Sequence, residues 1–254
     1  MNLAPLNYNF GNASNYSFAT TITCNNEDAR KMFVEGFGHM LNYNHEQAIA
    51  CYMNVTELDP TCAMAWWGIA YCVSSNYNWT PGLGSGYDPI QQAISLKAGC
   101  TALEQDLIDA LAERHSEEAR DAADPSVLNM GNSPELNIAF AKAMAPLYLK
   151  YKGNLDIAAI YVEALMNLNA WQLWNKNTET GEITPLDNNT LLCVKVMEDA
   201  FENISGAKQH IALCHLYCHC LELSPLPNPS IDMRWHVYKV THTRHGGAQQ
   251  ISCR

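Results

Sequence analysis

The sequence predicts an all-α fold, and three observations support this prediction. Apolar residues recur at three- and four-residue steps over most of the chain, as on the buried face of an amphipathic helix. Capping residues, prolines and glycines fall at the ends of these periodic stretches. No stretch of useful length alternates apolar and polar residues in the manner of a half-buried strand. Hydrophobic residues make up 48% of the 254 positions, so the chain can bury a sizeable core.

The helical pattern begins near Asn26, after a polar and aromatic segment, residues 1–25, which is expected to be an extended lead-in. A second helix is expected to follow Asn44, which can cap it together with Gln47 in a capping box. This helix should end before Pro60, because the residue that precedes a proline is disfavoured in the helical region. A third helix is expected to start directly after this proline.

The rest of the chain is predicted to be a series of helices with one inserted loop. Residues 74–87 are rich in glycine, asparagine and aromatic residues, and long structured loops of this kind are often functional. Thr101 and Glu104 form a capping-box signature, and Ser133 precedes a proline and an acid, which is a strong helix start. Further helices are expected at about 88–96, 101–118, 133–152, 155–168, 188–203 and 207–223. The helical domain is thus placed at 26–225, with a linker at 121–132 and an irregular tail at 226–254.

The charge balance disfavours two classes of partner. Lysine and arginine total 15 against 26 acidic residues, a net charge of −11, which disfavours nucleic acids and anionic lipid surfaces. No apolar run is long enough to span a bilayer, and Met1–Asn12 has no secretory pattern, so a cytoplasmic location is expected. The ten cysteines are therefore expected to be reduced. Several lie on apolar helix faces, namely Cys51, Cys62, Cys72 and Cys193.

Residues 29–62 have the length of a repeating helix–turn–helix unit of roughly 34 residues. Such a unit has small residues where two helices approach closely, large residues in the neighbouring gaps, and a proline at its end. In this chain these are Gly36, Ala48 and Ala70, then Tyr52 and Trp66, and finally Pro60. The run from Trp66 to Ala70 fits the W-x-x-L-G opening of a tetratricopeptide repeat, with isoleucine and alanine in place of leucine and glycine.

Longer motifs carry a resemblance to a known family. They are Asn44-His45-Glu46-Gln47-Ala48, the segment 59–71, Asn76-Tyr77-Asn78, Glu163-Ala164-Leu165-Met166, Trp171 with Trp174, and His215-Leu216-Tyr217-Cys218-His219 with Glu222, Ser224 and Pro225. In this order and over roughly residues 8–227, the chain resembles a large family of uncharacterised tetratricopeptide-repeat proteins. The resemblance implies a solenoid of stacked antiparallel helix pairs and implies no established reaction. Members of the family usually continue with further repeats, so residues 228–254 are expected to be either a short native ending or an altered, truncated one.

The strongest candidates for a metal-binding or catalytic site are His215, His219 and Glu222. They lie at i, i+4 and i+7 and therefore share one face of a helix. Two imidazoles and a carboxylate at this spacing can hold a divalent metal with open positions. Leu216 occupies the position where zinc proteases carry a glutamate, so no general base is built in. The alternative is a buried polar stripe in which the histidines are hydrogen-bonded between repeats. The neighbouring thiols, Cys214, Cys218 and Cys220, are expected to be core residues.

A second set of residues is predicted to contact a ligand. It comprises Asn76, Tyr77, Asn78, Glu163, Trp171 and Trp174. Each has an ordinary structural alternative: the tryptophans can pack between helices, and the loop residues can satisfy their own backbone. Glu163 is either a buried acid with a partner or an exposed residue at the edge of the apolar face.

The sequence therefore predicts a binding protein more than an enzyme. No nucleophile elbow, phosphate loop or dinucleotide fingerprint is present. The expected function is a scaffold that binds a peptide or partner protein in the concave face of its repeats, without a cofactor, and the acidic balance favours a neutral or basic partner. The alternative is a metal-binding protein or metal-dependent enzyme that uses His215, His219 and Glu222. A third interpretation is a non-functional truncation.

Overall fold

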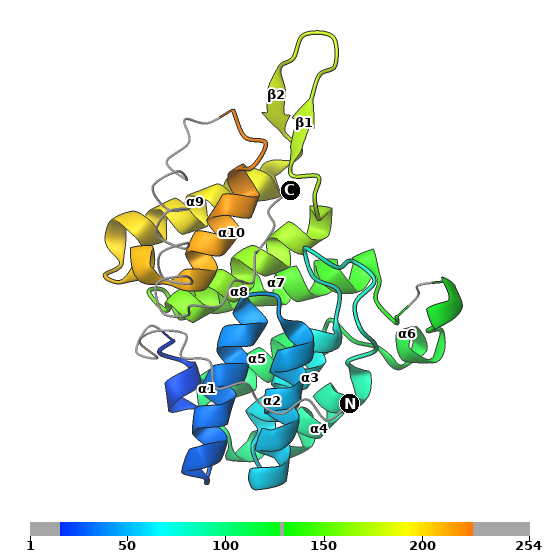
Figure 1. The fold of residues 1–254 in the computed structure, drawn as a ribbon, viewed down its shortest axis with the longest axis vertical. Coiled ribbons are helices and arrows are strands. Elements are labelled where there is room, and N and C mark those ends of the chain that lie inside the picture. The colour runs from blue at the N-terminus through cyan, green and yellow to red at the C-terminus, as the bar shows by residue number, and fades with distance from the viewer. Residues whose placement is uncertain (1–15, 128–129, 226–254) are drawn as a thin grey trace, which may run out of the picture.

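The structure is a computed structural model that describes residues 16–127 and 130–225 (Figure 1). Within these residues the chain forms ten α-helices and one two-stranded hairpin, which confirms the all-α class. The helices are α1 (Glu27–Leu41), α2 (His45–Leu58), α3 (Ala63–Val73), α4 (Tyr87–Leu96), α5 (Ala102–Ala112), α6 (Glu117–Asp121), α7 (Pro134–Lys150), α8 (Leu155–Met166), α9 (Asn188–Asn203) and α10 (Ile211–Leu221). The predicted tail, 226–254, lies outside the described residues.

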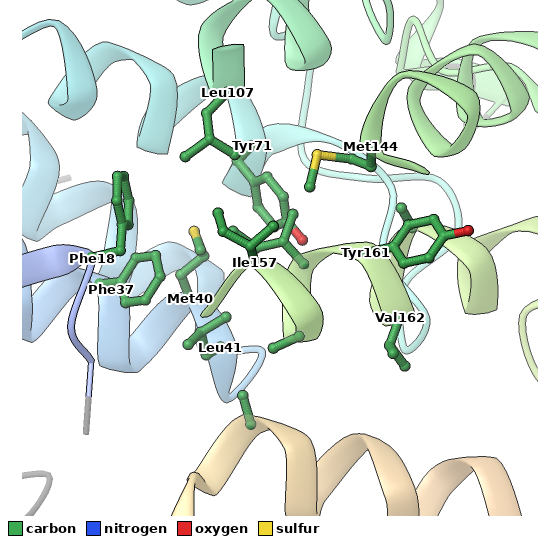
Figure 2. Packing of buried hydrophobic residues seen from close by; sticks show 14 of the residues in the cluster. Phe18, Phe37, Met40, Leu41, Tyr71, Leu107, Met144, Ile157, Tyr161 and Val162 are labelled. Atoms are coloured by element: carbon green, nitrogen blue, oxygen red, sulfur yellow. The ribbon is translucent and has the colours of Figure 1, made fainter. Parts of the chain in front are cut away.

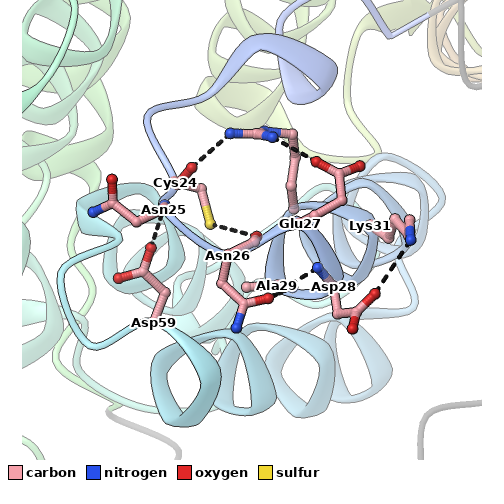
Figure 3. Close-up of polar contacts among 9 residues, drawn as sticks. Cys24, Asn25, Asn26, Glu27, Asp28, Ala29, Lys31 and Asp59 are labelled. Atoms are coloured by element: carbon pink, nitrogen blue, oxygen red, sulfur yellow. Dashed lines mark hydrogen bonds and ion pairs between the residues drawn. The ribbon is translucent and has the colours of Figure 1, made fainter.

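Helix ends follow the local capping signals in most places. At α5, Thr101 and Glu104 form both hydrogen bonds of the predicted capping box, and the Ser133 hydroxyl caps α7 by accepting from the backbone N–H of Leu136. At α1 the Asn26 side chain accepts from the backbone N–H groups of Asp28 and Ala29, in the first turn of the helix (Figure 3).

The predicted capping box at Asn44 is wrong, because the Asn44 side chain makes no capping hydrogen bond. Tyr43 takes the left-handed conformation, with φ at 60°, directly after α1. The backbone N–H of Asn44 then donates to the carbonyl of His39 at 3.0 Å, which closes the end of α1. Asn44 is thus part of the termination of α1, and its ψ of 58° is outside the extended range that N-caps normally use.

The described part of the predicted lead-in belongs to the core. Tyr16, Phe18 and Ile22 are buried, and a short 3₁₀ turn covers Ala19–Thr21. The backbone N–H of Phe18 donates to the Asp156 carboxylate of α8 at 2.9 Å. These aromatic residues have no helical period, so the sequence pattern did not reveal that they are buried.

The centre of the molecule is α8, in which every residue from Asp156 to Met166 is buried. Side chains of α8 such as Ile157 meet Phe37 and Met40 of α1 in one continuous core (Figure 2). Within α1, α2 and α3, Tyr52 is fully buried between two glycines. A Cβ atom placed on Gly36 would lie 3.0 Å from the ring, and one placed on Gly68 only 2.5 Å from it.

The residues expected to pack the repeat unit are placed as follows. Gly36, Ala48, Tyr52 and Ala70 are buried, Trp66 is half-buried and Pro60 is exposed. The large buried residue of α3 is Trp67, which is fully buried and donates from its indole N–H to the carbonyl of Leu107 at 3.1 Å. The aromatic anchor of α3 is therefore one position later than the sequence suggested.

The structure differs from the sequence prediction in two further segments. The helix predicted over 101–118 ends at Ala112, because Arg114 is buried and reaches back to the inserted loop, as described below. The turn-rich segment after Trp171 contains a hairpin of β1 (Trp174–Lys176) and β2 (Ile183–Pro185), with Asn175 opposite Thr184. Each strand is 3 residues long, which is too short for an alternating pattern to be recognised.

The first and last described helices meet. The Tyr43 ring at the end of α1 lies 5.4 Å from the His215 ring of α10, and Tyr16 lies 5.6 Å from His210. His210 Nε2 lies 3.0 Å from the Asp156 carboxylate, so α8, α10 and the segment before α1 share one buried polar contact. None of the described helices is long and apolar enough to cross a membrane, and no disulfide joins the cysteines in the described part of the chain.

Candidate functional site

The three residues singled out on α10 lie close together but do not converge on a single point. The Nε2 atoms of His215 and His219 are 3.1 Å apart, whereas the Glu222 carboxylate lies 3.6 Å from the other ring nitrogen of His219, Nδ1. Burial lowers the pKa of His215 to about 4, and it also lowers the pKa of His219 against an opposing effect of Glu222. At neutral pH the imidazole of His215 is therefore uncharged, and Glu222 is placed to orient His219.

Aromatic rings from three other elements surround these histidines. The Tyr77 ring lies 5.3 Å from the His219 ring and 5.1 Å from Trp171, and the Trp171 ring is 5.8 Å from His219 at a steep angle. Trp171 is 49% exposed and has a positive φ of 63°. The structure thus brings Tyr77, Trp171 and His219 together, with Trp171 at the surface. We call the group of Tyr43, Tyr77, Trp171, His215 and His219 the aromatic–histidine cluster.

Asn76 holds the inserted loop in place beside this cluster. Its side-chain oxygen accepts from the backbone N–H groups of Asn78 and Trp79, at 2.9 and 2.8 Å. This is the local turn that the sequence offered as the ordinary role of the loop residues. The side chain of Asn78 itself is exposed.

His45, to which the sequence pattern gave no chemical role, lies at the same place. Its Nδ1 is 2.9 Å from the carbonyl oxygen of Cys72 and 3.3 Å from the amide nitrogen of Asn76. A carbonyl oxygen can only accept, so a proton on Nδ1 satisfies the shorter contact. Nε2 is buried with no hydrogen-bond partner in the described residues. Burial lowers the pKa of His45 to about 4, which keeps this nitrogen unprotonated at neutral pH.

Glu163 is the buried acid of α8, with 3% of its surface exposed. One carboxylate oxygen accepts from the hydroxyl of Tyr71, and the other has no hydrogen-bond partner in the described residues. Burial raises the pKa of Glu163, and Tyr71, the buried Arg114 and the amide of Asn167 partly offset that rise. Of the two alternatives left open by the sequence, the structure places this residue in the interior with a partner.

Arg114 connects this interior to the loop. Its guanidinium donates to the backbone carbonyl of Ser75 at 2.6 Å and to the Asn137 side chain at 2.9 Å, and it lies 5.2 Å from the centre of the Phe140 ring. A fully buried arginine is costly unless its donors are satisfied. These bonds explain why the predicted helix stops early and why the loop after α3 is fixed against α7.

A cleft of about 500 Å³ opens beside these groups. It lies between the inserted loop, the start of α7, the end of α8 and the start of α9. Its amide-bearing lining residues are Asn76, Asn132, Asn137, Asn167, Asn169, Gln172 and Asn189. Asp187 is the single charged residue among those that line it, and its carboxylate caps α9 and accepts from Asn169 at 2.9 Å. The cleft therefore combines amide groups with apolar surface and carries one negative charge.

Asn167 differs from the other amides of this cleft. Asn76, Asn132 and Asn137 are committed to the loop and to Arg114. Both amide atoms of Asn167 are buried, and neither makes a hydrogen bond of acceptable geometry within the described residues, although the amide is close enough to Glu163 to lower its pKa. An unsatisfied buried amide costs about 1–3 kcal/mol, so this site has unused hydrogen-bonding capacity.

Trp174 does not join the cluster. It is buried, and its indole N–H donates to the backbone carbonyl of Cys220 at 2.6 Å, which fixes the hairpin against α10. The thiols expected in the core of α10 are buried at Cys214 and Cys220, whose pKa values burial raises to about 12, whereas Cys218 is half-buried.

Comparisons with protein-family models, with curated proteins and with solved structures found no match.

Proposed function

We propose that this chain is a helical-repeat binding protein that holds an extended peptide segment of a partner in the asparagine-lined cleft. In this proposal α1, α2 and α3 are a tetratricopeptide-like unit, and the protein acts in the cytoplasm with reduced thiols. The observation that carries the proposal is the unsatisfied amide of Asn167 in a cleft lined by seven amide side chains.

The chemistry of the amide favours a peptide backbone as the ligand. An asparagine side chain offers an acceptor oxygen and an NH₂ donor group, so it can bond the N–H and the C=O of one peptide unit at the same time. Such bonds are independent of the ligand's side chains, which suits a scaffold. With one carboxylate in the lining and a net charge of −11, the segment is expected to be neutral or basic.

A blocking variant tests this proposal. Ile138 lines the cleft and is 41% exposed, whereas Leu149 on the same helix is 70% exposed and does not line the cleft. Phage-displayed random peptides would be selected on the unmodified protein, and their affinities measured by fluorescence anisotropy. We expect Ile138→Trp to weaken binding of the selected peptides at least ten-fold and Leu149→Trp to leave it unchanged. Equal affinities for all three proteins, or no enriched peptide, would contradict the proposal.

A second candidate function, divalent metal binding, is favoured by the His215–His219 pair. Two imidazole nitrogens bound to one zinc ion at about 2.0–2.1 Å are roughly 3.1–3.4 Å apart, close to the 3.1 Å observed here. Glu222, which faces the opposite ring nitrogen, would act as the carboxylate that orients a ligand histidine. Metal analysis of the untagged protein and of a His215→Ala/His219→Ala variant tests this candidate. Bound metal that is absent from the variant supports it, and a folded, metal-free unmodified protein contradicts it.

A further inference from the structure

Three metal-binding side chains meet between α1 and α2, on residues to which the sequence pattern gave no role. Glu35 and His39 lie four residues apart on α1, and Cys51 lies on the facing α2. One ligand atom of each residue lies within 4.8 Å of the other two. These residues belong neither to the cleft nor to the aromatic–histidine cluster.

The backbone holds the cysteine against this pair. Gly36 follows Glu35 directly, and a Cβ atom at Gly36 would be 3.0 Å from the Cβ of Cys51. This distance is shorter than ordinary van der Waals contact, so the absence of a side chain at Gly36 allows α1 and α2 to approach closely. The separation of the three ligands is therefore fixed by helix packing.

The surroundings suit a cation that carries two positive charges. His39 and Cys51 are buried, and Glu35 is half-buried. A dication would balance the charges of one thiolate and one carboxylate, and the imidazole would add a neutral ligand.

Gln47 is a second observation at the same place. Its side-chain nitrogen is buried with no hydrogen-bond partner in the described residues. The same amide lies close to the Cys51 thiol. A donor aimed at the sulfur would stabilise a metal-bound thiolate, as outer-shell hydrogen bonds do in metal sites.

We propose that Glu35, His39 and Cys51 form a binding site for a zinc-type transition-metal ion. Thiolate, imidazole and carboxylate are together typical ligands of Zn²⁺, and a thiolate argues against Mg²⁺ and Ca²⁺. Binding replaces the S–H bond of Cys51 with a metal–sulfur bond and releases one proton to water. Ligand atoms around tetrahedral zinc are roughly 3.5 Å apart, so ligand atoms within 4.8 Å of one another would need to approach by at most about 1.3 Å.

Cobalt(II) is a suitable probe because its bond to a thiolate gives a charge-transfer absorption in the near ultraviolet. The untagged full chain would be treated with a chelator, desalted and titrated with Co²⁺, with proton release followed by an indicator dye. We expect the thiolate band to saturate at one cobalt ion per chain, with about one proton released for each ion that gives the band, and we expect Zn²⁺ to remove the band. Cobalt held by the His215–His219 pair would add no thiolate band.

Variants distinguish this site from other thiols and from the His215–His219 pair. Cys51→Ser should abolish the band, and Glu35→Gln, a substitution of equal size at a half-buried position, should weaken cobalt binding at least ten-fold. Two control variants should keep the thiolate band. They are Cys62→Ser, at a buried thiol outside the proposed site, and His215→Ala/His219→Ala. The proposal is overturned if the folded unmodified protein gives no thiolate band, if the band survives in Cys51→Ser, or if Glu35→Gln binds cobalt as tightly as the unmodified protein.

Discussion

The position of Gly68 against the Tyr52 ring leads to a strong prediction about the helix packing. A methyl group at Gly68 would lie 2.5, 2.6 and 2.7 Å from three atoms of the ring, about 1 Å short of ordinary contact. The ring cannot retreat, because its other edge faces Gly36, where the equivalent distance is 3.0 Å. Tyr52 itself is fully buried and its hydroxyl lies against the Met40 sulfur at 3.5 Å.

The expected cost of Gly68→Ala follows from two opposing effects. Overpacking a well-filled core typically costs about 1–3 kcal/mol, and overlap with three atoms of a trapped ring places this variant at the upper end. Alanine in place of a helical glycine stabilises a helix by about 1 kcal/mol. We therefore expect a net loss of about 2 kcal/mol in the free energy of unfolding, measured by urea denaturation.

Two further variants make this test specific. Gly99 lies in a 3₁₀ turn, and a methyl group added there would have no atom within 4 Å, so Gly99→Ala should change stability by less than about 0.5 kcal/mol. In a double-mutant cycle, Tyr52→Leu should reduce the cost of Gly68→Ala by at least ~1 kcal/mol. If Gly68→Ala unfolds at the same urea concentration as Gly99→Ala, the Tyr52 ring does not set the spacing of α1 and α3.

Three other predictions concern buried polar groups. Arg114→Met should lower the free energy of unfolding by about 3 kcal/mol and expose loop 74–87 to limited proteolysis, because the loop loses its buried hydrogen bonds; an unchanged cleavage rate would oppose this. Burial lowers the pKa of His45 to about 4 and that of His115 to about 3, so below about pH 6.5 the unfolded chain binds protons that the fold excludes. These two rings should each reduce stability by about 2 kcal/mol between about pH 7.5 and 5, and a urea midpoint that does not fall over this range would contradict the assignment. Trp174→Phe should cost about 1–2 kcal/mol, because a buried carbonyl of α10 loses its donor, and differential scanning calorimetry would detect no change if the indole hydrogen bond were unimportant.

The sequence predicted most helix ends because capping is local. The capping box at Thr101 and Glu104 involves residues three apart, and the range 188–203 predicted for a helix is the range of α9. The predicted capping box at Asn44 failed because of the backbone conformation of the residue before it. Tyr43 adopts a left-handed conformation that glycine usually supplies, so the residue types did not show that Asn44 would close α1 instead of capping α2.

The candidate site was predictable only where its residues lie on one helix. The periodicity of α10 placed His215 and His219 side by side, and their Nε2 atoms are indeed adjacent. It could not place Glu222, which lies at the C-terminal end of α10 and turns toward the other ring nitrogen. His45 and Arg114 reach their partners 27 and 39 residues away in sequence, and no local pattern encodes such contacts.

Trp171 and Trp174 show how a short turn decides a side chain's role. The sequence led to the same prediction for both, since they are three residues apart beyond the end of α8. The positive φ of Trp171 turns its ring outward over His219, whereas Trp174 begins β1 and is buried against α10. Asn167 was missed because an asparagine at the end of a helix is ordinary, and only the tertiary structure shows that its amide is unsatisfied.

The most direct test of the proposed binding function is the affinity of a selected peptide for Asn167→Leu, measured beside the unmodified protein. Leucine keeps the size of the side chain and removes the amide, which also takes from the buried Glu163 carboxylate a group that favours its charged form, so a loss of about 1 kcal/mol in stability is expected. The proposal predicts at least ten-fold weaker peptide binding by a protein that remains folded, with only a slightly lower urea midpoint. Equal affinity for the two proteins would contradict the claim that the cleft recognises its ligand through Asn167.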